Sequence, residues 1–133
     1  MIKTCAEDHQ VLIVDDDALT REAVAELVQL CTGHTAVAAS DGEEALAMLR
    51  GGLSPCVILL DLWMPRTDGY SFRTAQLLDR ALREVPVVIC SADPMAPRGH
   101  DHLQAAAYLQ KPITAESITD AVSAHCRRAT ASI

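Results

Sequence analysis

The chain has 133 residues, of which half are hydrophobic, and a formal net charge of −7. Its uninterrupted apolar runs are a handful of residues long, whereas a membrane-spanning helix needs about 20, so we expect no contact with a membrane. Residues 1–66 hold 11 acidic against 4 basic side chains, and residues 67–133 hold 7 of each. Because nucleic-acid binding requires a basic patch, this balance argues against nucleic acid as a partner.

Length and cysteine content indicate one domain in a reducing compartment. We expect a single domain over residues 1–133, with its core at about residues 10–127. Residues 1–10 are polar and lack the apolar segment of a signal peptide. No C-x-x-C pair occurs, which favours structural thiols and a cytoplasmic protein. The cysteines are Cys5, Cys31, Cys56, Cys90 and Cys126.

The first predicted element is a buried strand at residues 11–14, uniformly apolar and followed by the acids at residues 15–17. A helix is predicted for residues 19–31, with Asp17 as its N-cap and Gly33 after its last turn. Apolar residues recur at helical spacing and should form its buried face. They are Leu19, Ala23, Val24, Leu27, Val28 and Cys31.

Residues 35–39 are predicted to form a short strand. Ser40 and Glu43 then match a capping box, in which Ser40 caps the next helix and Glu43 bonds back to it. Residues 57–60 are four consecutive apolar residues, and Asp61 follows them directly. This pattern is typical of a strand buried on both faces, in the interior of a parallel sheet.

The second half of the chain continues the alternation. A helix should start near Asp68 and a strand should cover residues 85–91, whereas prolines and a glycine in and beside residues 95–104 predict only a short fourth helix. A fifth strand is expected at residues 105–109, and Thr114 should cap the final helix. The inward-facing residues should be Phe72, Ala75, Leu78 and Leu82 in the third helix, and Ile118, Ala121 and Val122 in the last.

Alternating short strands and amphipathic helices predict an α/β fold. Right-handed crossovers return the chain parallel to the previous strand, which gives a doubly wound five-stranded parallel sheet with helices on both faces. In such sheets ligands bind beyond the carboxyl ends of the strands. The polar residues expected there are Asp15, Asp16, Asp61, Ser91 and Lys111.

These strand-end residues predict a phosphoryl-transfer site. Two carboxylates about 4 Å apart repel by roughly 4 kcal/mol at an effective dielectric near 20, so three converging acids need a cation. Oxygen ligands suit Mg²⁺, and a carboxylate, Mg²⁺, a lysine and a hydroxyl together can transfer phosphoryl groups. The alternatives are that Asp61 only turns the chain and that Lys111 is a surface residue. Asp17 is interpreted as a helix cap, and His100 and His102 as solvated residues.

Four short motifs carry a family resemblance. In this order and spacing, the chain resembles a response-regulator receiver domain of two-component signalling, similar to chemotaxis regulators, from about Gln10 to about Arg127. The resemblance implies a flavodoxin-like strand order, 2-1-3-4-5. The motifs are Val14-Asp15-Asp16, the Asp61-Leu62-Trp63-Met64-Pro65 stretch with Asp68-Gly69, Ser91-Ala92, and Tyr108 followed by Lys111-Pro112.

The resemblance also implies a role for each matching residue. Asp61 would be the phosphoacceptor and would receive a phosphoryl group from a phosphohistidine on a sensor histidine kinase or a histidine phosphotransfer protein. Mg²⁺ would be held by Asp16, Asp61 and the backbone carbonyl of Trp63. Asp15 would act through water or on Lys111, which would pair with the phosphoryl oxygens.

The implied switch consists of two residues. The Ser91 hydroxyl would move to the phosphoryl group and Tyr108 would turn inward behind it, although Tyr108 could also be ordinary packing. The peptide bond between Lys111 and Pro112 is expected to be cis.

The expected function is a phosphorylation-controlled binding module, not an enzyme, which catalyses only its own phosphotransfer and autodephosphorylation. It would act on an unidentified downstream protein, with a phosphorylation-dependent dimer as one form of output. The chain would be either a stand-alone receiver or a piece of a larger regulator. One alternative is a pseudo-receiver used for docking or dimerisation. Another is an aspartyl-phosphate phosphatase, which would need an acid where Trp63 stands.

Overall fold

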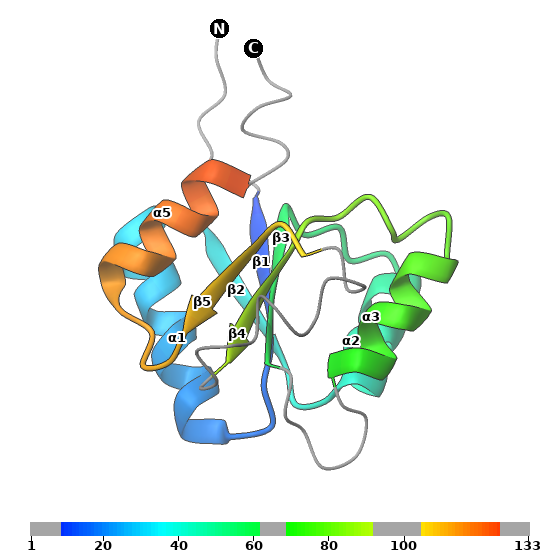
Figure 1. The fold of residues 1–133 in the computed structure, drawn as a ribbon, viewed down its shortest axis with the longest axis horizontal. Coiled ribbons are helices and arrows are strands. Elements are labelled where there is room, and N and C mark those ends of the chain that lie inside the picture. Colours follow the sequence, from blue (N-terminus) through cyan, green and yellow to red (C-terminus); the bar gives the residue numbers. More distant parts are fainter. Residues whose placement is uncertain (1–8, 62–68, 92–104, 126–133) are drawn as a thin grey trace, which may run out of the picture.

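The computed structural model describes residues 9–61, 69–91 and 105–125, and the fold within these ranges is a five-stranded parallel sheet between two pairs of helices (Figure 1). The strand order is β2-β1-β3-β4-β5, which confirms the predicted doubly wound topology. In chain order the elements are β1 Gln10–Val14, α1 Ala18–Thr32, β2 Thr35–Ala39, α2 Gly42–Arg50, β3 Val57–Asp61, α3 Gly69–Leu78, β4 Val87–Ser91, β5 Ala107–Gln110 and α5 Ala115–His125. The fourth helix predicted at residues 95–104 lies outside the described residues.

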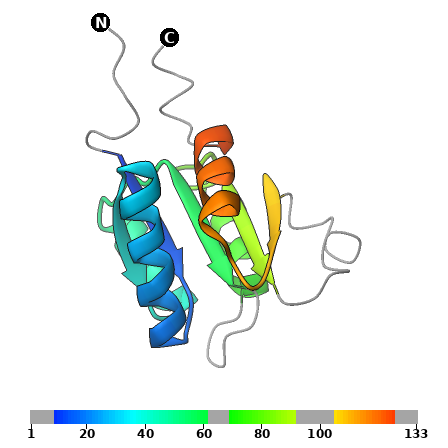
Figure 2. The same cartoon turned by 90° about the vertical axis from the view of Figure 1, so that its left-hand side faces the viewer.

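Helices cover both faces of the sheet. α1 and α5 pack on one face and α2 and α3 on the other, as Figures 1 and 2 show from two directions. Side chains of β1 and β3 alternate between the two faces, so Leu12 and Ile58 join the core under α2 and α3, and Val11 and Val57 join the core under α1 and α5. Because both faces are buried, these strands are continuously apolar, which is the pattern that identified them in the sequence.

The ends of α1 are capped as predicted. The Asp17 side chain accepts a hydrogen bond from the Thr20 backbone N–H, and Gly33 takes the left-handed conformation, with φ 76°, at the C-cap. Glycine adopts this conformation without the steric penalty of a Cβ atom. At α5, Thr114 Oγ1 accepts the Ser117 N–H at 3.1 Å, which confirms Thr114 as a cap.

The predicted cap of α2 is wrong by one residue. Asp41, not Ser40, is the N-cap, and its side chain accepts the Glu44 N–H at 2.8 Å. Glu44, not Glu43, bonds back, because its carboxylate accepts the Ser40 N–H at 2.8 Å. The sequence Ser-Asp-Gly-Glu-Glu fits the capping box in two registers, and the folded chain takes the second.

Two predicted apolar faces are also partly wrong. In α1 only Val24 and Val28 are buried, while Leu19 is 77% exposed and Ala23 and Cys31 are exposed as well. Leu78, the last residue of α3, is 81% exposed. The reason is the position of each helix over the sheet, which brings a narrower stripe into contact than the apolar spacing suggests.

The turn after α3 adds side chains to the core under α2 and α3. Leu82 is buried, as predicted, but from this turn and not from the helix. Gln76, which is fully buried, holds the turn because its Nε2 donates to the backbone carbonyls of Leu82 at 2.9 Å and Val85 at 3.1 Å. Burial of this amide is therefore matched by hydrogen bonds. Within the described ranges, no helix has both the length and the hydropathy to cross a membrane.

Candidate functional site

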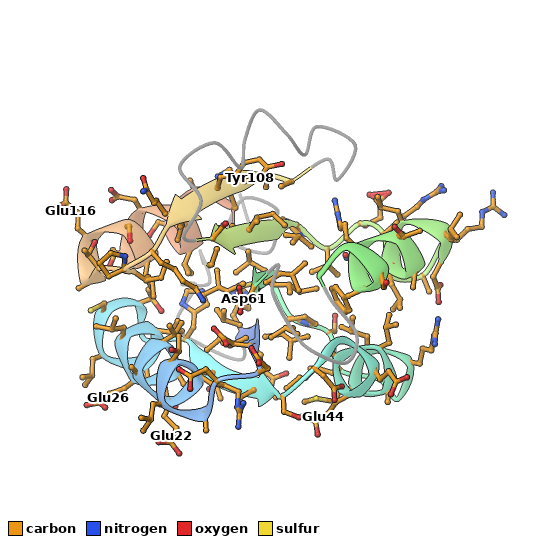
Figure 3. The ribbon with its side chains drawn as sticks, turned by 60° about the horizontal axis from the view of Figure 1, so that its bottom comes forward. Glu22, Glu26, Glu44, Asp61, Tyr108 and Glu116 are labelled. Atoms are coloured by element: carbon orange, nitrogen blue, oxygen red, sulfur yellow. The ribbon has the colours of Figure 1, made fainter. Side chains whose placement is uncertain are left out.

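The carboxyl ends of the central strands bring the predicted site residues together. Val14 pairs with Leu60 in the sheet, so Asp15 and Asp61, the residues that follow these two, lie at the same edge. Asp61 pairs with Cys90, the residue before Ser91. The Lys111 backbone N–H donates to the Ser91 carbonyl at 2.8 Å. Figure 3 looks onto this edge and shows Asp61 near its centre.

Three carboxylates converge at this edge. Asp15, Asp16 and Asp61 each offer an oxygen, and these oxygens lie within 4.8 Å of one another. Asp15 and Asp61 are buried, whereas Asp16 is exposed. A set of carboxylate oxygens with one side open to water fits Mg²⁺, which takes few carboxylates and keeps several water ligands. The residues present therefore fit the predicted ion.

Lys111 lies against two of these acids. Its Nζ is 3.4 Å from Asp61 Oδ1 and 3.5 Å from Asp15 Oδ2. Burial by itself lowers the pKa of Lys111, but the Asp61 and Asp15 carboxylates outweigh it and raise the pKa above its usual value. The ammonium group is thus charged at neutral pH and offsets part of the repulsion between the two acids.

The backbone of the β1–α1 turn holds Asp15 in place. Asp15 Oδ1 accepts the Asp17 N–H at 2.9 Å. The backbone carbonyl of Asp15 accepts a hydrogen bond from Arg21 Nη1 at 2.8 Å. The sequence analysis did not identify Arg21 as a residue of this edge. Its position one turn after the acid run is the signal that could have suggested a contact with the loop before α1.

Ser91 and Tyr108 lie on β4 and β5. Ser91 is the last residue of β4 and is buried, so its hydroxyl lies at the same edge of the sheet as Asp61. Tyr108 is half-buried on β5, pairs with Ile89 of β4 and packs against the core under α2 and α3. Figure 3 shows it on the outer strand, away from Asp61. Trp63, the predicted carbonyl ligand, lies outside the described residues.

The Lys111–Pro112 peptide bond is cis, as predicted. Four glutamates of the surrounding helices do not join the acid cluster, since Figure 3 shows Glu22, Glu26, Glu44 and Glu116 pointing outward. The edge thus combines carboxylates, a lysine cation and a hydroxyl, and its carboxylate oxygens can serve as ligands for a divalent ion. This combination can accept and bind a phosphoryl group.

A second cluster, which sequence reasoning missed, lies at the opposite edge of the sheet. His9, His34 and Cys56 are all buried, and one potential ligand atom from each lies within 4.8 Å of the other two. Burial lowers the pKa of His34 below its ordinary value. The residues are 22 or more positions apart in the sequence, so no local spacing signal could have identified them.

Comparison with known proteins places the chain beside bacterial response regulators. The family profile described as response regulator receiver domain matches residues 11–123. Protein PilG of Pseudomonas aeruginosa is 30% identical over 120 residues, which are 89% of this chain and 88% of PilG. The positive alginate biosynthesis regulatory protein of the same organism is 38% identical over 116 residues, or 84% of this chain, but the chain spans only 45% of that protein.

A solved structure gives the same result. Chemotaxis protein CheY4 of Vibrio cholerae superposes with a TM-score of 0.79 at 26% identity, covering 88% of this chain and 98% of CheY4. The structural similarity therefore extends over most of the chain.

Proposed function

Because the chain belongs to the response-regulator receiver family, we propose that it is a phosphoacceptor switch in which Asp61 receives a phosphoryl group from a phosphohistidine. The donor is a sensor histidine kinase or a histidine phosphotransfer protein, and the reaction takes place in the cytoplasm. The observation that carries the proposal is the position of Lys111 Nζ, within 3.5 Å of both Asp61 and Asp15 and beside the three converging carboxylates.

In the proposed reaction an Asp61 carboxylate oxygen attacks phosphorus, and the bond between phosphorus and the donor's imidazole nitrogen breaks. The electron pair of that bond returns to the imidazole, and Asp61 becomes an acyl phosphate. Lys111 forms an ion pair with Asp61 beforehand and afterwards pairs with a phosphoryl oxygen. Mg²⁺, held by Asp15, Asp16, Asp61 and the Trp63 carbonyl, would neutralise charge on the phosphoryl group.

The proposed output depends on Ser91 and Tyr108. Ser91 would donate its hydroxyl to a phosphoryl oxygen, and Tyr108 would turn inward from β5. Moving a two-state equilibrium from 1:99 to 99:1 requires about 5.5 kcal/mol, so a single new hydrogen bond does not drive the switch alone. The charge-assisted contacts of Lys111 and Ser91 must therefore act together to change the surface that a downstream protein binds.

Phosphorylation can be tested directly on the intact chain. Incubation with Mg²⁺ and acetyl phosphate should add one phosphoryl group, measured by intact mass, and hydroxylamine should remove it because an acyl phosphate is labile. The Asp61→Asn variant should take up none, since an amide is not a nucleophile here. Asp120→Asn, an exposed acid on α5, is the matched control and should react like the wild type. Wild-type chain that stays unmodified under donor excess would contradict the proposal and favour a docking module.

The proposed docking surface for the donor is an apolar groove beside the acid cluster. It is lined by residues of α1 and of the segment after β5, and Lys111 belongs both to this groove and to the acid site. Leu19, which is 77% exposed, stands at one side of the groove, and Ile113 is on the other. A helix that presents a phosphohistidine could bury these apolar side chains while its imidazole reaches Asp61.

This docking surface predicts a difference between donors. The test uses a histidine kinase that phosphorylates the wild type. Leu19→Asp should slow phosphotransfer from this kinase about tenfold, because it places a charge in an apolar contact. It should leave the rate with acetyl phosphate unchanged. Leu78→Asp, at an equally exposed leucine on the opposite face of the sheet, is the control. Equal slowing by both variants would contradict this placement of the kinase.

A further inference from the structure

The His9, His34 and Cys56 cluster lies at the amino ends of three adjacent strands. His9 immediately precedes β1, His34 immediately precedes β2, and Cys56 immediately precedes β3. Figure 1 shows these strand ends at the edge opposite to the start of α1. The strands rise by roughly 3.3 Å per residue, so this edge is about 20 Å from the acid cluster at the other end of β1. The two clusters are therefore separate.

The backbone fixes the three segments relative to one another. The Thr35 N–H donates to the His9 carbonyl at 3.2 Å, and the Cys56 N–H donates to the Gln10 carbonyl at 2.8 Å. The side chains of His9 and His34 are almost fully buried and that of Cys56 is fully buried. Each therefore has a restricted position that the sheet itself sets, as a preorganised site requires.

A hydrogen bond also determines which His34 nitrogen can act as a ligand. Thr32 Oγ1 donates to the Val28 carbonyl at 2.6 Å, so this hydroxyl can only accept from His34 Nδ1, which is 2.9 Å away. The neutral imidazole then carries its proton on Nδ1 and its lone pair on Nε2. Metal-bound histidines are commonly oriented in this way, by a hydrogen bond from the nitrogen that does not bind the metal.

The geometry suits a tetrahedral ion. Bonds of about 2.0 Å to nitrogen and 2.3 Å to sulfur set the ligands of zinc about 3.5 Å apart, and the three atoms are already within 4.8 Å of one another. The rings of His9 and His34 are tilted by 46° with centroids 6.0 Å apart, so they are not stacked, and each can direct a nitrogen to a common point. Nitrogen and sulfur ligands select a borderline-soft cation and not Mg²⁺.

From these contacts we propose that His9, His34 and Cys56 form a Zn²⁺ site, in which the Cys56 thiol releases its proton to solvent and binds as thiolate. The three side chains leave one position of the tetrahedron for water or a fourth ligand. The bound ion would join the amino ends of β1, β2 and β3. At the opposite edge of the sheet, Asp15 follows β1 and Asp61 ends β3. Zinc would thus stabilise the strands that support the phosphoacceptor without touching it.

Cobalt binding to the intact metal-free chain tests the site, with Mg²⁺ in excess to fill the acid cluster. One equivalent of Co²⁺ should produce a thiolate-to-metal charge-transfer band and the d–d bands of tetrahedral cobalt, and Zn²⁺ should abolish both. The acid cluster offers no sulfur and cannot produce the first band. The thiolate-to-metal band should be absent from His34→Gln and Cys56→Ala. It should persist in His125→Gln and Cys31→Ser, which change a histidine and a cysteine elsewhere.

Two measurements on the wild-type chain keep the test independent of how the variants fold. Zinc-edge X-ray absorption should give one sulfur and two imidazole nitrogens in the ligand shell. Free Zn²⁺ at 100 times its Kd should raise the melting temperature by about 10 °C. No stoichiometric binding, or a ligand shell without sulfur, would overturn the proposal and make the cluster a purely structural group of buried polar side chains.

Discussion

The two edges of the sheet carry different chemistry on the same strands. At the carboxyl edge, Asp15 and Asp61 contact a lysine, and the exposed Asp16 opens the site to water. At the amino edge, the nitrogen and sulfur atoms of His9, His34 and Cys56 are buried. The first edge is open to water and offers hard oxygen ligands, whereas the second is buried and offers nitrogen and sulfur ligands.

This difference shows how a parallel sheet separates a reactive site from a structural one. Every strand points the same way, so residues before the strands gather at one edge and residues after them gather at the other. The strand cores between the edges are apolar and tightly packed. Substitutions at one edge should therefore leave the chemistry of the other unchanged.

The largest effect should come from Lys111 at the carboxyl edge. Lys111→Met removes the cation that pairs with the phosphoryl oxygens, and we expect phosphorylation by acetyl phosphate to slow by about 100-fold. The rate is measured by intact mass at fixed Mg²⁺. Arg80→Met, which removes an exposed positive charge after α3, is the control. Cobalt binding at the amino edge should be the same in both variants, and a loss there would show that the two edges are coupled.

A medium effect should come from Cys90, a buried residue of β4 that pairs with Asp61 beside the carboxyl edge. Burial raises the pKa of its thiol to about 12 from a usual value of 9.0. The folded thiol therefore stays neutral while the unfolded thiol ionises, so the stability that it contributes is lost as pH rises above 9.0. At about pH 10 the loss should be about 1.4 kcal/mol.

Urea unfolding at about pH 8 and about pH 10 measures this loss. The difference in unfolding free energy between the wild type and Cys90→Ala should shrink by that amount between the two pH values. A difference that is constant with pH would show that Cys90 ionises equally in both states and that water reaches its thiol in the folded chain.

The smallest effect should come from the start of α2. Asp41→Ala removes the N-cap and should cost about 1 kcal/mol of unfolding free energy, with no change in phosphorylation. Ser40→Ala is the matched control and should have little effect, because the contact of Ser40 with Glu44 uses its backbone N–H. Urea unfolding measures both. A larger loss of unfolding free energy in Ser40→Ala than in Asp41→Ala would show that Ser40 is the N-cap, as the sequence suggested.

Much of the fold and of the acid cluster could be predicted from the sequence because both depend on pattern. The runs at residues 11–14 and 57–60 have no polar alternation, which only strands covered on both sides tolerate. Once they are parallel strands, Asp15 and Asp61 must meet at one edge. The caps at Asp17 and Thr114 were predictable for a similar reason, since each depends on residues close in sequence, whereas the cis bond before Pro112 was expected from the family resemblance.

Other features depend on distances between segments, which the sequence does not state. Leu19 and Leu78 have the spacing of core residues but are exposed, because the packing of each helix on the sheet covers a narrower stripe of its surface than the spacing suggests. Two capping registers fit the sequence at α2, and only the folded chain shows that Asp41 is the N-cap.

By itself, the sequence determined the order of strands and helices and the identity of the residues after each strand. Local hydrogen bonding and the burial of apolar side chains act over a few neighbouring residues, so the chain itself encodes them. The tertiary structure alone decided which apolar side chains are covered and that His9, His34 and Cys56 meet. Those outcomes depend on the register between β1, β2 and β3, which forms only when the whole sheet is packed.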